Sequence, residues 1–351
     1  MNSITSAHLR FERRVSVRQC ATGSETMKIT TSALAVFAAG IALTAGTANA
    51  TVRLKLADAL AADHPTSVIL EQFAEEVEEK TDGEVKIRLY MNGVLGSERE
   101  VLEQVQNGAV DITRVSAANL ENFNPIYQAF TLPYLFNSQE HFYKVMDGPI
   151  VDPVYQASLD SGFMGLTYFD SGARSFYTKS QCVETPDDLK GQKLRVINSH
   201  TSIRMVELMG GIPTPLPYGE IYTALQQGVI DGAENNPTAL TLGRHGEVVK
   251  CYSLDEHLRI PDFLVISKTA MDKLTDEQIA IIKEAAVNAT QAQKKVWNEA
   301  VDEAMQQIEE MGVTIVTPDK APFQEKVAPL IEEYKQDPAI GQLVDAIQNA
   351  Q

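Results

Sequence analysis

Apolar and polar residues follow two different rhythms in the stretch that begins at residue 51. Apolar residues alternate with polar ones over 52–56 and again over 85–89, which predicts two half-buried strands. Between them, apolar residues fall at helical spacing over 70–77, after a break at His64-Pro65. A further helix over 98–107 leads to a short strand over 111–115. This alternation of strands and helices predicts an α/β fold with mixed sheets flanked by helices.

A second unit begins near Gly172 and repeats the mixture of strands and helices. Pro213 and Pro215 are expected to break the chain within this unit, because proline removes a backbone donor. Asp231-Gly232 is typical of a turn leading into a loop. The predicted strand and the two predicted helices of this unit cover residues 193–197, 201–209 and 219–227.

The longest predicted element is one helix from Asp276 to Met311. Thr275 and Gln278 form a Thr-x-x-Gln capping box, and Gly312 is expected to end the helix. An unbroken helix of this length extends about 54 Å, so we expect it to lie along both units. A coiled coil is the alternative, but the apolar stripe is too irregular and too rich in alanine for steady heptads. The stripe consists of Ile279, Ile282, Ala286, Val296, Ala300, Ile308 and Met311.

The first 50 residues have the layout of a leader. From Met27, a short positive start is followed by an apolar stretch and then by Ala48-Asn49-Ala50, which predicts a secretory signal over 27–50 that is cleaved after Ala50. A membrane anchor is the alternative, but the apolar run over 33–45 is shorter than the roughly 20 residues that span a bilayer. Residues 1–26 are polar and rich in arginine, and they precede a credible start at Met27. We expect the true start to be Met27, so that residues 1–26 come from a gene boundary set too far upstream.

Composition narrows the function classes. The chain has 351 residues, is 44% hydrophobic and carries a formal net charge of −17, which disfavours nucleic-acid binding. After the proposed cleavage, Cys182 and Cys251 remain, and two cysteines in an oxidising compartment favour a disulfide over two separate thiols. No later segment is apolar enough to span a membrane, so the mature protein is not expected to be membrane-inserted.

Motifs of catalysis are not found in the sequence. It has no nucleophile elbow, Walker loop, dinucleotide fingerprint or HExxH helix. The histidines are scattered, and we interpret His200, His245 and His257 as surface residues or as residues behind a site. Arg174 lies among apolar and aromatic residues, and Arg195 lies on a predicted strand. Arg195, flanked by Leu194 and Val196, can point outward on strand alternation, or it can face a cleft and pair with a carboxylate.

Seven segments in the same order resemble the periplasmic binding subunits of TRAP (tripartite ATP-independent periplasmic) transporters, the DctP-type receptors. The resemblance covers 51–351 and implies a two-lobed binding protein with a hinge. It implies that 51–172 with 262–300 form lobe I, and that 173–261 with 301–351 form lobe II. The segments are HPTSVILEQFAEEVEEKTDGEVKI, LGSEREVLEQVQNGAVDITRVS, LPYLF, DSGARSFYT, TPDDLKGQKLRV, GGIPTPLPYGEIYTALQQGVIDGAENNP and YSLDEH.

The resemblance also implies roles for residues of the second lobe. Arg195, in KLRV, matches the arginine that pairs with the ligand carboxylate in most members of the family. Arg174 matches a second pocket arginine. Asn235 matches an asparagine that helps to bind the same carboxylate, and the neighbouring Asn236 is an alternative for this role. Tyr218 matches an aromatic wall of the cleft.

Three residues of the first lobe complete the expected site. Glu98 matches an acidic contact, Ser116 lies on a loop that faces the ligand, and His64 is a weaker candidate because members differ there. These polar groups suit the hydroxyls of a sugar acid such as glucuronate or galacturonate, and DSGARSFY and DGAENNP resemble the sugar-acid branch. A C4-dicarboxylate or another organic acid is the alternative ligand.

The function implied is capture of the acid in the periplasm by hinge closure and its delivery to the small and large membrane subunits of the permease. The family implies no cofactor, no metal and no catalytic residue. An exported enzyme acting on a sugar acid is one alternative. A sensor that passes its closed state to a membrane signalling partner is another, and its binding chemistry would be identical.

Overall fold

Two mixed β-sheets organise the chain in the computed structural model, which describes residues 50–350. The first sheet has five strands in the order β2-β1-β3-β10-β4. β1 pairs in parallel with β2 and β3, whereas β10 runs antiparallel to β3 and β4. The strands are β1 (Val52–Ala57), β2 (Val85–Tyr90), β3 (Ile112–Ser116), β4 (Phe163–Phe169) and β10 (Asp262–Ser267).

The second sheet has six strands in the order β11-β9-β5-β8-β6-β7. β5 is antiparallel to both β8 and β9, and β6 is parallel to β7 and β8. The strands are β5 (Arg174–Thr178), β6 (Lys193–Val196), β7 (Ile212–Pro215), β8 (Gly232–Asn235), β9 (Cys251–Leu258) and β11 (Thr314–Val316). We call the elements around the first sheet the first lobe and those around the second sheet the second lobe.

Helices cover both sheets. The helices of the chain up to β4 are α1 (Pro65–Lys80), α2 (Glu98–Gln106), α3 (Ala117–Leu120), η1 (Pro125–Thr131), α4 (Gln139–Met146), α5 (Asp152–Gln156) and η2 (Leu159–Ser161). Those that follow are η3 (Pro186–Leu189), α6 (His200–Leu208), η4 (Tyr218–Glu220), α7 (Ile221–Gln227), α8 (Pro237–Thr241), η5 (His245–Glu247), α9 (Lys268–Met271), α10 (Asp276–Glu310), α11 (Ala321–Tyr334) and α12 (Pro338–Asn349). The strands and helices predicted between residues 52 and 115 are therefore confirmed.

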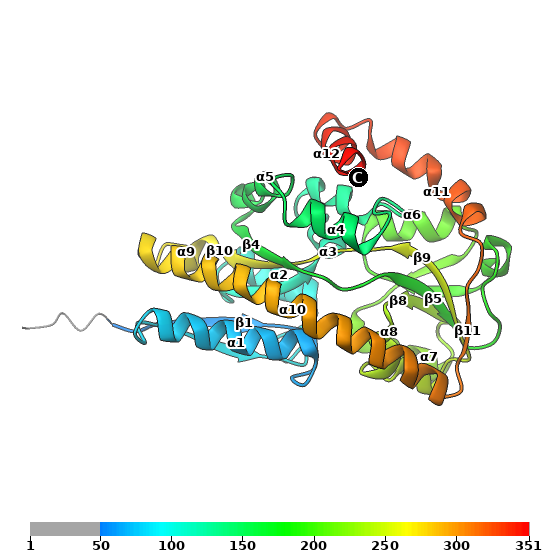
Figure 1. Cartoon of the computed structure of the whole chain (residues 1–351), viewed down its shortest axis with the longest axis horizontal. Coiled ribbons are helices and arrows are strands. Elements are labelled where there is room, and N and C mark those ends of the chain that lie inside the picture. Colours follow the sequence, from blue (N-terminus) through cyan, green and yellow to red (C-terminus); the bar gives the residue numbers. More distant parts are fainter. Residues whose placement is uncertain (1–49, 351) are drawn as a thin grey trace, which may run out of the picture. The chain divides into compact units, whose positions relative to one another are not determined.

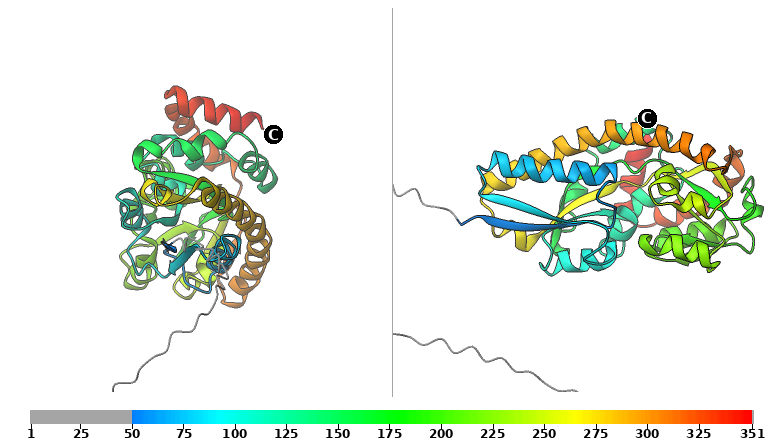
Figure 2. Two further views of the ribbon diagram at one scale, coloured as in Figure 1. Left: turned by 90° about the vertical axis from the view of Figure 1, so that its left-hand side faces the viewer. Right: turned by 90° about the horizontal axis from the view of Figure 1, so that it is seen from below.

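The long helix α10 lies along both sheets, as predicted (Figure 1). Its capping box between Thr275 and Gln278 is present, and Gly312 follows with a left-handed φ of 77°. The helix packs beside α1 and β4 in the first lobe and beside α8 in the second (Figures 1 and 2). The predicted apolar stripe is wrong at Met311, which is 39% exposed, because the helix has ended there.

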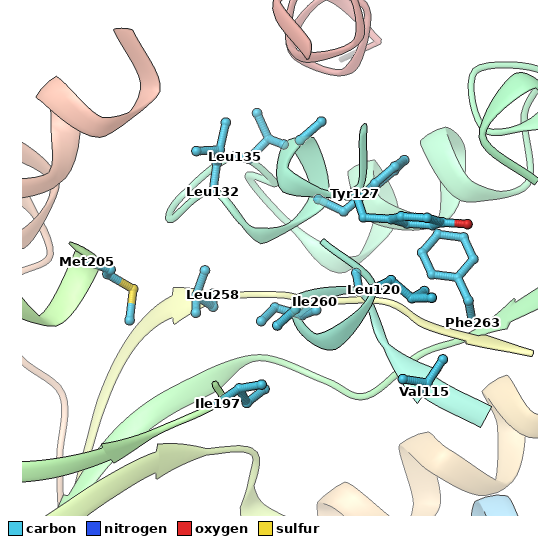
Figure 3. Packing of buried hydrophobic residues seen from close by; sticks show 14 of the residues in the cluster. Val115, Leu120, Tyr127, Leu132, Leu135, Ile197, Met205, Leu258, Ile260 and Phe263 are labelled. Atoms are coloured by element: carbon cyan, nitrogen blue, oxygen red, sulfur yellow. The ribbon is translucent and has the colours of Figure 1, made fainter. Parts of the chain in front are cut away.

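The largest buried cluster lies where the two lobes meet. Val115 and Phe263 from the first sheet belong to the same cluster as Ile197 and Leu258 from the second-lobe chain (Figure 3). The ring of Tyr127 packs edge-on against Phe263 at 5.2 Å between centroids. Residues of α11 and α12 also join this cluster, and α12 lies against η1. The proposed lobe boundaries remain a prediction.

Two segments of the second lobe differ from the sequence prediction. The stretch with Pro213 and Pro215 is not a break but strand β7, which pairs only with β6 at the edge of the sheet. Proline is tolerated there because its missing N–H faces no partner strand. The turn predicted at Gly232 is instead the start of β8, a fully buried strand between β5 and β6. Its sequence, GAEN, lacks the apolar alternation that signals a strand.

The predicted bridge between Cys182 and Cys251 is confirmed, with their Cα atoms 5.2 Å apart. It ties the segment after β5 to the first residue of β9. Within residues 50–350, no helix combines the length and the apolar character needed to cross a bilayer. The predicted signal over 27–50 and the extension over 1–26 lie outside the described residues, apart from Ala50.

Candidate ligand-binding cleft

A cavity of about 450 Å³ is lined by residues from both lobes. All eight residues proposed from the sequence line it. Most of them stand where strands end and helices begin, the usual position of ligand sites in α/β sheets. Their ligand contacts remain a prediction, but the chain folds so as to bring them to one place. The eight are His64, Glu98, Ser116, Arg174, Arg195, Tyr218, Asn235 and Asn236.

Helix caps fix three of these side chains. The Nδ1 atom of His64 accepts from the backbone N–H of Thr66 at the start of α1, so its proton lies on Nε2 and this nitrogen is a donor. Ser116 caps α3, and the Asn236 side chain accepts from Ala239 at the start of α8. Burial, assisted by the nearby Arg114, lowers the pKa of His64 to about 4, so this imidazole is neutral at neutral pH.

The first-lobe side of the cleft is built around Arg114, which the sequence reasoning did not propose. Its guanidinium pairs with Asp58 at 2.7 Å, with Asp262 at 2.8 Å and with Glu98 at 3.0 Å. Three carboxylates thus surround one cation, which leaves this side negative. Burial raises the pKa of the Asp262 carboxyl to about 6. Arg114 opposes this rise, and repulsion from Glu98 and Asp58 adds to it.

Glu98 is held in place by two further donors. Its carboxylate accepts from the backbone N–H of Ser116 at 3.2 Å and from the Asn119 amide at 2.7 Å. Because the side chain is fixed and still 15% exposed, it can accept a hydrogen bond from a ligand without reorganising.

The second-lobe side contains a buried ion network behind Arg174. The guanidinium makes two parallel bonds to Glu234, at 2.7 and 2.9 Å, and a third to Oδ1 of Asn235 at 2.8 Å. Burial by itself favours protonated Glu234, but Arg174 and His257 outweigh it and hold the pKa of this carboxyl at about 2. His257 in turn lies 2.7 Å from Asp255. Burial opposes its charge, yet Asp255 and Glu234 raise the pKa of His257 to about 9.

Arg195 differs from both of these arginines. It is only 4% exposed, and its Nε donates to the carbonyl of Leu216 at 2.8 Å. In the described part of the chain it forms no ion pair with a carboxylate. Burial lowers the pKa of Arg195, but a guanidinium stays charged in proteins. The cleft therefore holds one buried positive charge that forms no ion pair with a carboxylate of residues 50–350.

Two of the histidines of the second lobe lie behind the cleft, whereas His200 is exposed. His245 and His257 are both buried, so neither is a surface residue. His245 contacts the hydroxyl of Tyr177 at 2.7 Å and packs beside the ring of Tyr218. Burial lowers the pKa of His245 to about 3. Among residues 50–350, no three histidine, cysteine or carboxylate side chains are grouped so as to hold a metal ion.

The arrangement is suited to a polar anion. A carboxylate can approach Arg195 on one side, while hydroxyl groups donate to Glu98 on the other.

A sequence signal for Arg114 existed, since this charged residue interrupts the apolar strand that ends at Ser116. Strand alternation places such a residue on the opposite face from its apolar neighbours, and the sequence alone does not show that this face is the cleft.

Comparisons with known proteins agree with this geometry. The model of the bacterial extracellular solute-binding protein family 7, DctP, matches residues 56–337. A solute-binding protein of Chromohalobacter salexigens is 39% identical over 290 residues, which cover 82% of this chain and 86% of that protein.

Solved structures agree as well. A TRAP periplasmic solute-binding protein from Anaerococcus prevotii, with bound D-glucuronate, is 40% identical with a TM-score of 0.84. The alignment covers 86% of this chain and 98% of that chain. One from Xanthobacter autotrophicus, with bound β-D-galacturonate, is 37% identical with a TM-score of 0.83, and the alignment covers 85% of this chain and 100% of that chain. The chain belongs to the DctP family of bacterial extracellular solute-binding proteins.

Proposed function

We propose that this protein is the periplasmic receptor of a TRAP transporter and that its ligand is a uronate, D-glucuronate or D-galacturonate. The observation that carries the proposal is the buried guanidinium of Arg195, which has no carboxylate partner in the described chain and faces a cavity of about 450 Å³. A buried charge is stable only when it is paired, and a ligand carboxylate supplies the partner. Two family members of similar structure were solved with these acids bound.

The charge on the first-lobe side favours a uronate over a dicarboxylate. Glu98, Asp58 and Asp262 share the single cation of Arg114, so a second ligand carboxylate would meet negative charge. A sugar hydroxyl is instead a donor, and Glu98 is an acceptor that is already oriented. The opposite polarity of the two sides therefore selects a molecule with an anionic end and a hydroxyl-bearing end.

The mechanism is closure of the two lobes over the acid. Arg195 and Arg174 bind from the second lobe and Glu98 from the first, so the ligand gains its full set of contacts only when both sides meet. The ligand shifts the equilibrium toward the closed form by its higher affinity for that form. The closed receptor then docks on the membrane permease, which takes up the acid.

The experiment is calorimetric titration of the protein purified after export from cells that express the full chain, with co-purified ligand removed by unfolding and refolding. Four probes separate the chemistries: D-glucuronate, D-galacturonate, succinate and D-glucose. We expect saturable binding of at least one uronate, and binding at least 100-fold weaker for D-glucose, which lacks the carboxylate. Succinate binding as tight as the better uronate would contradict the proposed ligand class.

A further inference from the structure

Trp297 combines burial, position and an unused donor. It is the single tryptophan of the chain and lies on α10. Its side chain lines the cleft and the residue is only 2% exposed. The indole Nε1 atom is buried and has no hydrogen-bond partner among residues 50–350. Buried polar groups in native proteins nearly always have a partner, so this one requires an explanation.

The indole has cleft residues among its neighbours. Its ring lies 5.8 Å from the ring of His64, the N-cap of α1 in the first lobe. Gly172 is also close: its φ is +73°, and an added Cβ there would lie 3.4 Å from Nε1 of Trp297 and 3.5 Å from the Cβ of Asn236. The indole thus lies near a proposed ligand-binding residue and next to the segment where the chain passes from β4 to β5.

An indole N–H donates a hydrogen bond but cannot accept one, so its missing partner must be an acceptor. The carboxylates of the first-lobe side are engaged with Arg114, and the Asn236 amide donates to the carbonyl of Ser171 at 2.8 Å. Trp297 lines the cavity, so a ligand there can bring an acceptor to the buried Nε1 once the neighbouring side chains shift slightly. A sugar acid carries several acceptors: its carboxylate, its ring oxygen and its hydroxyls.

We propose that Trp297 is a ligand-binding residue whose Nε1–H donates a hydrogen bond to an oxygen of the bound acid. The inference rests on the proposed function, because it takes the same ligand in the same cleft. It adds a contact from α10, a helix that packs on both lobes. The ligand would then contact the first lobe, the second lobe and the helix that lies along both.

The single tryptophan makes the test direct, because a ¹H–¹⁵N spectrum of the protein contains one indole cross-peak. We expect that saturating D-glucuronate or D-galacturonate, whichever binds by calorimetry, moves this peak downfield in the proton dimension, as a new acceptor does. Equal D-glucose should leave the peak in place. A uronate that binds by calorimetry while the indole peak stays unmoved would overturn the inference and leave the proposed function standing.

A variant provides the second measurement. Trp297→Phe keeps an aromatic ring but removes the donor, and we expect its uronate affinity to fall about tenfold, the usual effect of one hydrogen bond. Tyr127→Phe is the matched control, because Tyr127 is a fully buried aromatic with a polar atom outside the cleft.

Unchanged affinity of Trp297→Phe would overturn the inference even if the peak moves. If that variant does not fold, the wild-type spectrum decides. Absence of any uronate binding by the wild-type protein is the distinct failure of the proposed function, and it removes this inference as well.

Discussion

Two buried arginines on opposite sides of the cleft, Arg114 and Arg195, differ in their partners. Arg114, on the first-lobe side, is surrounded by three carboxylates and is 3% exposed. Arg195, on the second-lobe side, is equally buried at 4%, but among the described residues it bonds only to a backbone carbonyl. The carboxylates around Arg114 neutralise its charge, whereas the charge of Arg195 is available to a ligand carboxylate. Burial alone does not distinguish these two arginines, but their hydrogen-bond and ion-pair partners do.

The largest expected effect concerns Arg114. Arg114→Met keeps much of the side-chain volume but leaves Asp58, Asp262 and Glu98 without their cation, so we expect the free energy of unfolding to fall by roughly 3–5 kcal/mol. Urea unfolding followed by circular dichroism measures it. Arg204→Met is the control, because Arg204 pairs with Glu207 on an exposed helix face. A variant as stable as the wild type would mean that the acidic cluster is not held by Arg114.

The corresponding change at Arg195 should act on binding instead. Arg195→Met removes a buried charge that has no carboxylate partner within residues 50–350, so the ligand-free protein should be as stable as the wild type or slightly more stable. Uronate affinity should fall roughly 100-fold or more, about 3 kcal/mol, because the bound carboxylate loses its counter-ion. Calorimetry and urea unfolding of the same sample separate the two effects. If stability falls while binding persists, the contrast between the two arginines is wrong.

The network behind Arg174 predicts a pH dependence of stability. The pKa of His257 is raised from its ordinary 6.5 to about 9, so the folded state binds its proton more tightly than the unfolded state does. This contribution is fully present below pH 6.5 and is lost as the pH rises through 9. The loss is up to about 3 kcal/mol.

Unfolding free energies measured between pH 6 and 10 test this expectation. His257→Gln should flatten the profile over that range, since glutamine does not titrate. His200→Gln is the control, because His200 is exposed and its imidazole contacts the hydroxyl of Tyr334 instead of Asp255 or Glu234. The expectation fails if the wild-type profile is as flat as that of His257→Gln.

Local rules made part of this molecule predictable. The capping box of α10 and the glycine that ends it involve residues within one or two turns, so they can be read directly from neighbouring letters. The eight proposed site residues came from the resemblance to a family, and all of them line one cavity, most at strand ends and helix starts. Their roles in binding are still a prediction that the variants above examine.

Long-range pairing accounts for what the sequence reasoning missed. Strand β8 looks like a turn in the sequence because its polar Glu234 and Asn235 are buried against Arg174, a residue about 60 positions earlier. Arg114 is buried because it forms ion pairs with Asp58 and Asp262, which lie on two other strands or at their ends. In each case the partner that justifies burying a polar side chain lies in another element, and no local pattern contains it.

The smallest expected effect probes the negative side of the cleft through ligand choice. Glu98→Gln keeps an acceptor toward Ser116 but removes one charge, so a second ligand carboxylate would meet less repulsion. At an effective dielectric constant near 20 or above, one charge at cleft distances is worth about 1 kcal/mol, which corresponds to roughly a fivefold gain in succinate affinity. Competition of succinate against D-glucuronate measures this ratio. Glu103→Gln is the matched control, because Glu103 lies on the same helix, is exposed and does not line the cavity. If both variants shift the ratio equally, the discrimination comes from the net charge of the protein; if neither does, it resides in the second lobe and not in the acidic side.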